Sequence, residues 1–86
     1  MDLHEMNRKA VNLLEQWDPF QQEKEAYEET IKAVVEALDL HDHPMDLAKS
    51  MRMSYEQSFH LWIPIEDCVQ VAYKLLALKY EAKSIV

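Results

Sequence analysis

A short run near the middle of the chain, His41-Asp42-His43, has the side chains best suited to bind a metal ion. Imidazole nitrogens and carboxylate oxygens are good ligands for zinc or nickel. A closed site needs further ligands that converge on one point, and alternate residues of a short loop rarely aim both rings at one ion. We therefore favour a junction in which His41 ends one helix and Asp42 or His43 caps the next. A metal-binding or hydrolytic function at this loop is kept as the alternative.

Other residues that could do chemistry are sparse. Cys68, the single cysteine, lies among apolar residues and is expected to be a small buried side chain and not a nucleophile. The chain has no glycine, which excludes the glycine-rich phosphate loop and the dinucleotide fingerprint, since both need a residue without a Cβ atom. We expect no catalytic residue, no metal, no cofactor and no enzymatic activity.

The charge of the chain is negative and unevenly placed. Its 86 residues include 16 acidic and 9 basic side chains, for a net charge of −7. Residues 1–43 hold 11 acidic and 4 basic side chains, whereas residues 44–86 hold 5 of each. Nucleic acids and anionic membrane surfaces both require clustered basic residues, so neither is an expected partner. An unknown protein with a basic surface fits this charge best.

Five residues are candidates for contact with such a partner. Glu25, Glu28 and Glu29 lie together on an acidic stretch that is also typical of a solvated helix face. Trp17 and Trp62 each stand two residues before a proline, and large aromatic side chains are favoured anchors of interfaces. Tryptophans at such corners more often fill the core, so both interpretations stay open.

Three prolines divide the chain into helices. Proline is tolerated at the first position of a helix, so Pro19, Pro44 and Pro64 are each expected to open one, after a first helix at about residues 3–16. Asp18 and Gln21 have the spacing of a capping box around Pro19. The short connections favour antiparallel neighbours. The sequence predicts a single all-α domain, residues 1–86, folded as a compact four-helix bundle of two helical hairpins.

The last helix, expected from Pro64 to about residue 82, differs from the others. Its apolar residues cover most of the circumference and leave only Glu66, Gln70 and Lys74 as a narrow polar stripe. A helix that is apolar nearly all round is central to its domain or is shared with another chain. A structural homodimer through residues 65–82 is therefore a further alternative.

Several spaced motifs together resemble a known family of short Bacillus-type proteins. They are Trp17-Asp18-Pro19, Tyr27-Glu28-Glu29, His41-Asp42-His43-Pro44, Tyr55, Ser58-Phe59, Ile63-Pro64, Cys68 and Ala72, followed by Leu75-Leu76-Ala77-Leu78. This pattern looks like the YugE-like family, a domain of unknown function. Family members often have glycine after the Trp-Asp-Pro element, where this chain has residues 21–24, Gln-Gln-Glu-Lys. The resemblance implies a small α-helical fold and brings no activity with it.

The combined pattern predicts a small protein-interaction module of adaptor, inhibitor or immunity type. An acidic helical face would meet a basic surface on the partner. The N-terminal residues lack both the basic start and the apolar stretch of a secretory signal, so a cytoplasmic location is expected.

Overall fold

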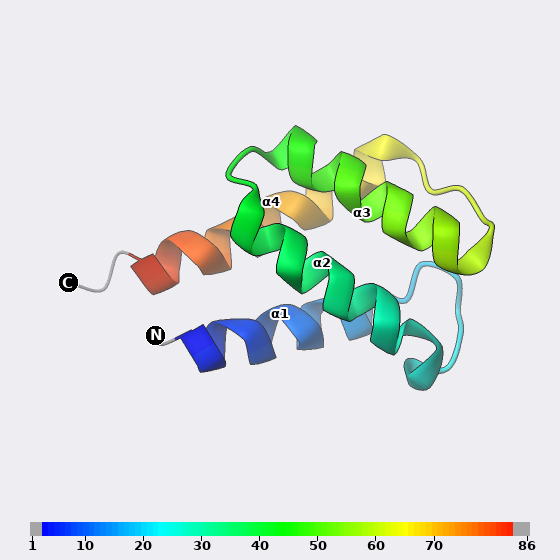
Figure 1. Ribbon diagram of the computed structural model, residues 1–86, viewed down its shortest axis with the longest axis horizontal. Coiled ribbons are helices and arrows are strands. Elements are labelled where there is room, and N and C mark those ends of the chain that lie inside the picture. Colours follow the sequence, from blue (N-terminus) through cyan, green and yellow to red (C-terminus); the bar gives the residue numbers. More distant parts are fainter. Residues whose placement is uncertain (1–2, 84–86) are drawn as a thin grey trace.

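The computed structural model describes residues 3–83, with side chains from His4 to Glu81. The described part of the chain contains four α-helices and one 3-10 turn, joined by short connections (Figure 1). They are α1 (Leu3–Trp17), the 3-10 turn η1 (Lys24–Tyr27), α2 (Glu28–Leu40), α3 (Pro44–Phe59) and α4 (Ile65–Lys83). Residues 3–83 contain no strand. The predicted all-α fold and compact helical bundle are confirmed.

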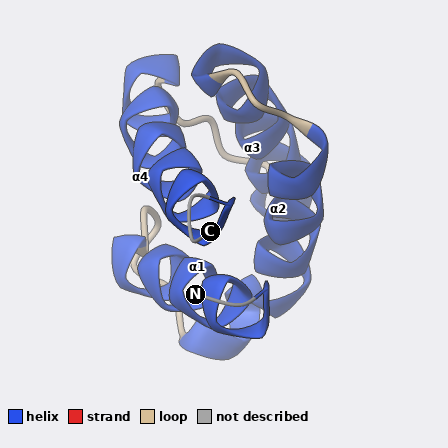
Figure 2. Cartoon of the chain, turned by 90° about the vertical axis from the view of Figure 1, so that its left-hand side faces the viewer, coloured by secondary structure: helices blue, strands red, loops and turns tan. Residues whose placement is uncertain are grey.

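The helices surround one apolar core. Apolar side chains recur at spacings of three and four residues, so each helix turns one face inward. Figure 2 shows α1, α2, α3 and α4 arranged around a common centre, which these buried side chains fill. The most deeply buried of them include Leu14, Val34, Leu38, Leu47, Met51, Ala72 and Leu75.

Helix α4 is well packed within the bundle. It packs against each of the other three helices, and its closest neighbour is α3. Its inward positions Cys68, Ala72 and Leu75 are fully buried. This packing accounts for the apolar residues on the inner side of α4, whereas Tyr73, Ala77 and Tyr80 add apolar surface on its exposed side. None of the helices within residues 3–83 has the length and hydropathy that a membrane span requires.

Two of the three prolines mark helix starts as the sequence predicts. Pro44 is the first residue of α3, and the backbone oxygen of His43 accepts a hydrogen bond from the Leu47 amide at 3.0 Å. Pro64 directly precedes α4, where its oxygen accepts hydrogen bonds from the backbone amides of Asp67 and Cys68. At both places proline occupies a position whose N–H would have had no helical partner.

The prediction for Pro19 is wrong. Residues 18–23 form an irregular connection, and α2 begins only at Glu28. Asp18 and Gln21 have φ values of 38° and 54°, in the left-handed region that a right-handed helix does not use. The predicted capping box therefore does not form.

A tyrosine hydroxyl accounts for the path of this connection. The Tyr27 hydroxyl accepts hydrogen bonds from the amides of Phe20 at 3.1 Å and Gln22 at 3.4 Å, and donates to Asp18 Oδ1 at 2.5 Å. Asp18 Oδ1 also accepts from the Gln22 amide at 2.9 Å. The backbone amides of Phe20 and Gln22 lie where the first turn of a helix after Pro19 would begin. They are bonded instead to the side chain of Tyr27, which directly precedes α2.

Candidate functional site

A groove between α1 and α2 combines apolar and charged side chains. Its volume is about 330 Å³. The floor is apolar and consists of Val11 from α1 with Ile31 and Val35 from α2. Ile31 and Val35 are four residues apart, so they lie one turn above the other on the same face of α2. Val11 and Val35 remain partly accessible, which leaves an apolar strip open between the two helices.

Charged side chains border this strip. Glu28, Lys32 and Glu36 follow one edge of α2, and Glu15 closes the side of α1. Glu15 is largely covered and pairs with Lys24 at 3.7 Å. The border thus carries three carboxylates and one lysine, so the groove is apolar at its floor and net negative at its margin.

Two adjoining hollows extend the groove along α1. One lies toward the N-terminus of α1, beside Arg8, Lys9 and Asn12, and also includes Val11 and Glu15. The other lies toward the α1–α2 connection, beside Asp18, Gln22 and Tyr27. Glu15 borders all three hollows. The three hollows thus lie along α1 and share Glu15, and the one near the connection contains both Asp18 and Lys24.

The structure separates the three predicted glutamates. Glu28 borders the groove, whereas Glu25 lies in η1 and Glu29 on α2, both exposed and outside its lining. The groove residues Glu15 and Glu36, and the apolar floor, were not predicted. The spacing of Ile31 with Val35 and of Glu28 with Lys32 and Glu36 was available in the sequence. Their meeting with Val11 depends on how α1 packs on α2, which spacing along one helix does not reveal.

The two predicted tryptophans have opposite surroundings. Trp17 packs edge-on against the buried ring of Tyr55, with centroids 5.2 Å apart and planes at 80°. It belongs to an aromatic cluster at the end of the bundle that also contains Phe20, Tyr27 and Phe59. Trp62, in the loop between α3 and α4, is 63% exposed. Trp17 is thus a partly buried residue that packs against the core, whereas Trp62 is the more exposed of the two.

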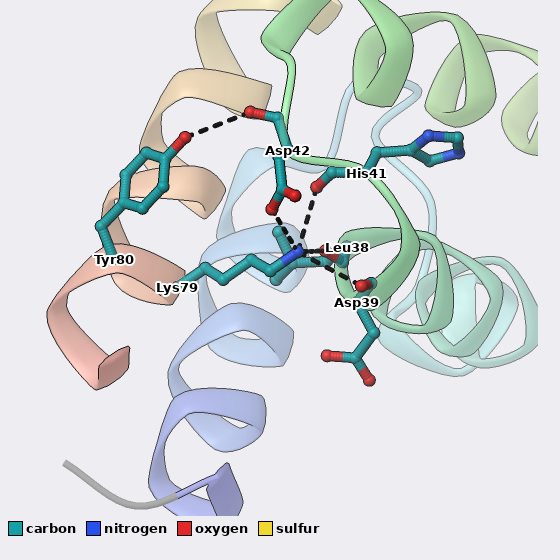
Figure 3. Close-up of polar contacts among 6 residues, drawn as sticks. All are labelled: Leu38, Asp39, His41, Asp42, Lys79 and Tyr80. Carbon is teal, nitrogen blue, oxygen red and sulfur yellow. Dashed lines mark hydrogen bonds and ion pairs between the residues drawn. The ribbon is translucent and has the colours of Figure 1, made fainter. Parts of the chain in front are cut away.

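The loop His41-Asp42-His43 is held by a buried lysine (Figure 3). Lys79 of α4 is 5% exposed, and its Nζ donates hydrogen bonds to the backbone oxygens of Leu38 at 2.7 Å, His41 at 3.1 Å and Asp39 at 3.3 Å. Asp42 Oδ1 lies 3.0 Å from the same Nζ. Carbonyl groups at a helix C-terminus lack intrahelical partners and carry partial negative charge, so Lys79 satisfies the end of α2.

The loop lies at the predicted junction between two helices, but the predicted side-chain cap of the second helix is not formed. His41 is the residue after α2, and its ring points away from Lys79 (Figure 3). His43 occupies the N-cap position of α3 but makes no side-chain capping bond. Within residues 3–83, no three histidine, cysteine, aspartate or glutamate side chains lie close enough together to hold a metal ion.

Three further ionisable side chains, those of Cys68, Tyr27 and Tyr55, are buried in the core. Burial raises the pKa of the Cys68 thiol to about 11, which opposes formation of the reactive thiolate at neutral pH. Burial likewise raises the pKa of Tyr55, and burial with the hydrogen bond to Asp18 raises the pKa of Tyr27. Cys68 is fully covered, as predicted.

Comparisons with known proteins agree with this fold. Residues 9–85 match the model of the family described as Domain of unknown function (DUF1871). The chain is 38% identical over 72 residues to the uncharacterized protein YugE of Bacillus subtilis strain 168, and the match covers 84% of each chain. It is also similar to the crystal structure of APC36109 from Bacillus stearothermophilus, at 32% identity and a TM-score of 0.86, over 91% of this chain and 96% of the other. The chain therefore belongs to the DUF1871 family, a domain of unknown function.

Proposed function

We propose that this chain is a protein-interaction module that binds a basic segment of a partner protein in the groove between α1 and α2. The observation that carries the proposal is an open apolar floor bordered by Glu15, Glu28 and Glu36. An apolar centre with a charged rim is the usual anatomy of a protein interface. The partner segment need not be long, because the groove residues of α2 run from Glu28 to Glu36, about two helical turns.

The charge distribution supports a basic partner. The excess negative charge lies in residues 1–43, the half of the chain that forms both walls of the groove. Complementary charge speeds encounter and selects among partners, while the apolar floor supplies most of the affinity. An adaptor, inhibitor or immunity-type role, in the cytoplasm, is the form of this function that we expect.

Site-specific photocrosslinking in lysate of the source organism tests the proposal. A photoreactive phenylalanine replaces Val35 in the groove, and in a matched control it replaces Gln57, an exposed residue of α3. We expect a crosslinked protein at position 35 that is absent at position 57. Mass spectrometry of the crosslinked peptide should identify a segment with both apolar and basic residues.

Reversing the charge of two glutamates at the border of the groove supplies the internal control. Glu28→Lys combined with Glu36→Lys should abolish the crosslink at position 35. The proposal is wrong if position 35 gives no crosslink, if both positions give the same one, or if the crosslinked segment is acidic.

A homodimer through α4 is the second candidate. Tyr73 and Tyr80 are 61% and 53% exposed on the outward side of this helix, seven residues apart, so they lie on one face. Of the predicted segment 65–82, the side chain of Ala82 lies outside the described residues. Light scattering over micromolar concentrations should give a dimer mass that Tyr73→Glu reduces to a monomer, and a monomer mass throughout would remove this candidate.

A further inference from the structure

The charges along the groove edge of α2 alternate in sign. Glu28, Lys32 and Glu36 are each four residues apart and all border the groove. Four residues advance an α-helix by about 6 Å and return the side chain to nearly the same face. A segment lying in the groove therefore meets a negative, a positive and a negative group at intervals of about 6 Å.

These three charges are available to a partner. All three side chains are exposed. The ion pairs of the described residues include Lys9 with Glu5, Lys24 with Glu15 and Lys79 with Asp42, and none of these involves Glu28, Lys32 or Glu36. A partner can thus pair with them without first breaking an internal ion pair.

We infer that the groove selects a helical segment of the partner protein that carries a basic, an acidic and a basic residue at positions i, i+4 and i+8. The inference rests on the proposed function, because it specifies what that groove binds. A cation at i pairs with one glutamate, the acidic residue pairs with Lys32, and a cation at i+8 pairs with the other glutamate. The pattern is symmetric, so it fits in either direction of the bound helix.

A helix suits this groove better than an extended segment. An extended chain has to find hydrogen-bond partners for its backbone groups, which usually come from the edge of a sheet. No strand is present in residues 3–83, and the floor residues Val11, Ile31 and Val35 offer no side-chain hydrogen bonds. A helix satisfies its own backbone and can press one apolar face against this floor.

Lys32 makes the groove selective against uniformly basic segments. A segment with three cations at the same spacing gains two favourable contacts but places its middle cation against Lys32. Like charges in contact oppose binding and discriminate between partners. An exposed charge contact changes affinity by up to about fivefold, so replacing attraction by repulsion at Lys32 is expected to change it by about fivefold to tenfold.

Selection from a displayed peptide library tests the inference. The probe is a library of helical peptides with one constant apolar face, in which positions i, i+4 and i+8 beside that face are randomised among Lys, Glu and Ser. The library is selected on the wild-type chain, on Lys32→Glu and on Val35→Asp, and the enriched triplets are sequenced. A control, Lys74→Glu, makes the same charge change on the exposed surface of α4.

The expected outcome is specific for each protein. Lys-Glu-Lys should be enriched about fivefold or more over Lys-Lys-Lys on the wild-type chain and on Lys74→Glu. Lys-Lys-Lys should be preferred on Lys32→Glu, and Val35→Asp should show no enrichment. Equal enrichment of Lys-Lys-Lys on the wild-type chain and on Lys32→Glu would overturn the inference and leave the proposed function standing. If no triplet is enriched on the wild-type chain beyond its level on Val35→Asp, both the inference and the proposed function are wrong.

Discussion

At the scale of single residues, the buried side chain of Lys79 makes several polar contacts. Lys79 reaches from α4 to three backbone oxygens at the end of α2 and to the carboxylate of Asp42. A buried ammonium group is tolerated only when its donors are satisfied, and here the acceptors outnumber them. The lysine thereby connects α4 with the end of α2, two helices that are separated in the sequence by α3.

Replacement of this lysine should destabilise the fold. We expect Lys79→Met to lower the free energy of unfolding by about 2–3 kcal/mol, because methionine keeps the apolar stem but leaves buried carbonyl groups without a donor. Urea denaturation measures the change. Lys74→Met, at an exposed position of the same helix, should stay within about 0.5 kcal/mol of the wild type. Equal effects of the two substitutions would show that the contacts of Lys79 are not stabilising.

At the scale of elements, the chain forms its turns without glycine. Asp18, Gln21 and His60 all adopt positive φ, and each lies at or just after the end of a helix or within the α1–α2 connection. The left-handed conformation costs a residue with a Cβ about 1–2 kcal/mol. A glycine at position 21 would adopt this conformation without that cost.

Glycine at position 21 should therefore stabilise the protein. We expect Gln21→Gly to raise the free energy of unfolding by about 0.5–1 kcal/mol, since relief of the strained φ outweighs the greater flexibility of the unfolded chain. Gln22→Gly is the matched control, because Gln22 does not have positive φ, and it should lower stability slightly. Thermal unfolding of both variants checks the difference, and a loss of stability in both would contradict this explanation.

Most element boundaries follow from local sequence, and the exception has a non-local cause. Pro44 and Pro64 mark helix starts because the fixed φ and missing N–H of proline suit the start of a helix. Pro19 fails because Tyr27, eight residues further on, binds the backbone amides of Phe20 and Gln22. Glu28 could be predicted as a surface residue from the pattern of its own helix. The groove that it borders could not be predicted in this way, because it depends on the packing of α1 against α2.

At the scale of the whole molecule, the core contains three weak acids whose pKa values are raised by burial. They are Cys68, Tyr27 and Tyr55. Each is protonated in the folded state at a pH where the unfolded chain has already begun to release the proton. The stabilisation is complete below the pKa of the unfolded chain and is lost as the pH rises through the folded value.

Stability should consequently fall in alkaline solution. The pKa of Cys68 rises from 9.0 to about 11, so its contribution, on the order of 1–2 kcal/mol, should disappear between about pH 9 and pH 11. Urea denaturation as a function of pH measures this loss. Cys68→Ala is expected to be less stable at neutral pH but to show a shallower decline above pH 9. Parallel curves for the two proteins would contradict the role of the thiol.

The central claim is that the partner binds the α1–α2 groove and not the acidic surface in general. The direct test is the dissociation constant of the crosslinked partner segment for two charge-matched variants, Glu28→Lys/Glu36→Lys at the groove and Glu25→Lys/Glu29→Lys outside it. Both variants change the net charge equally and alter exposed residues. We predict at least a tenfold loss of affinity for the groove variant and a change within about threefold for the other. Equal losses for the two variants would contradict the account.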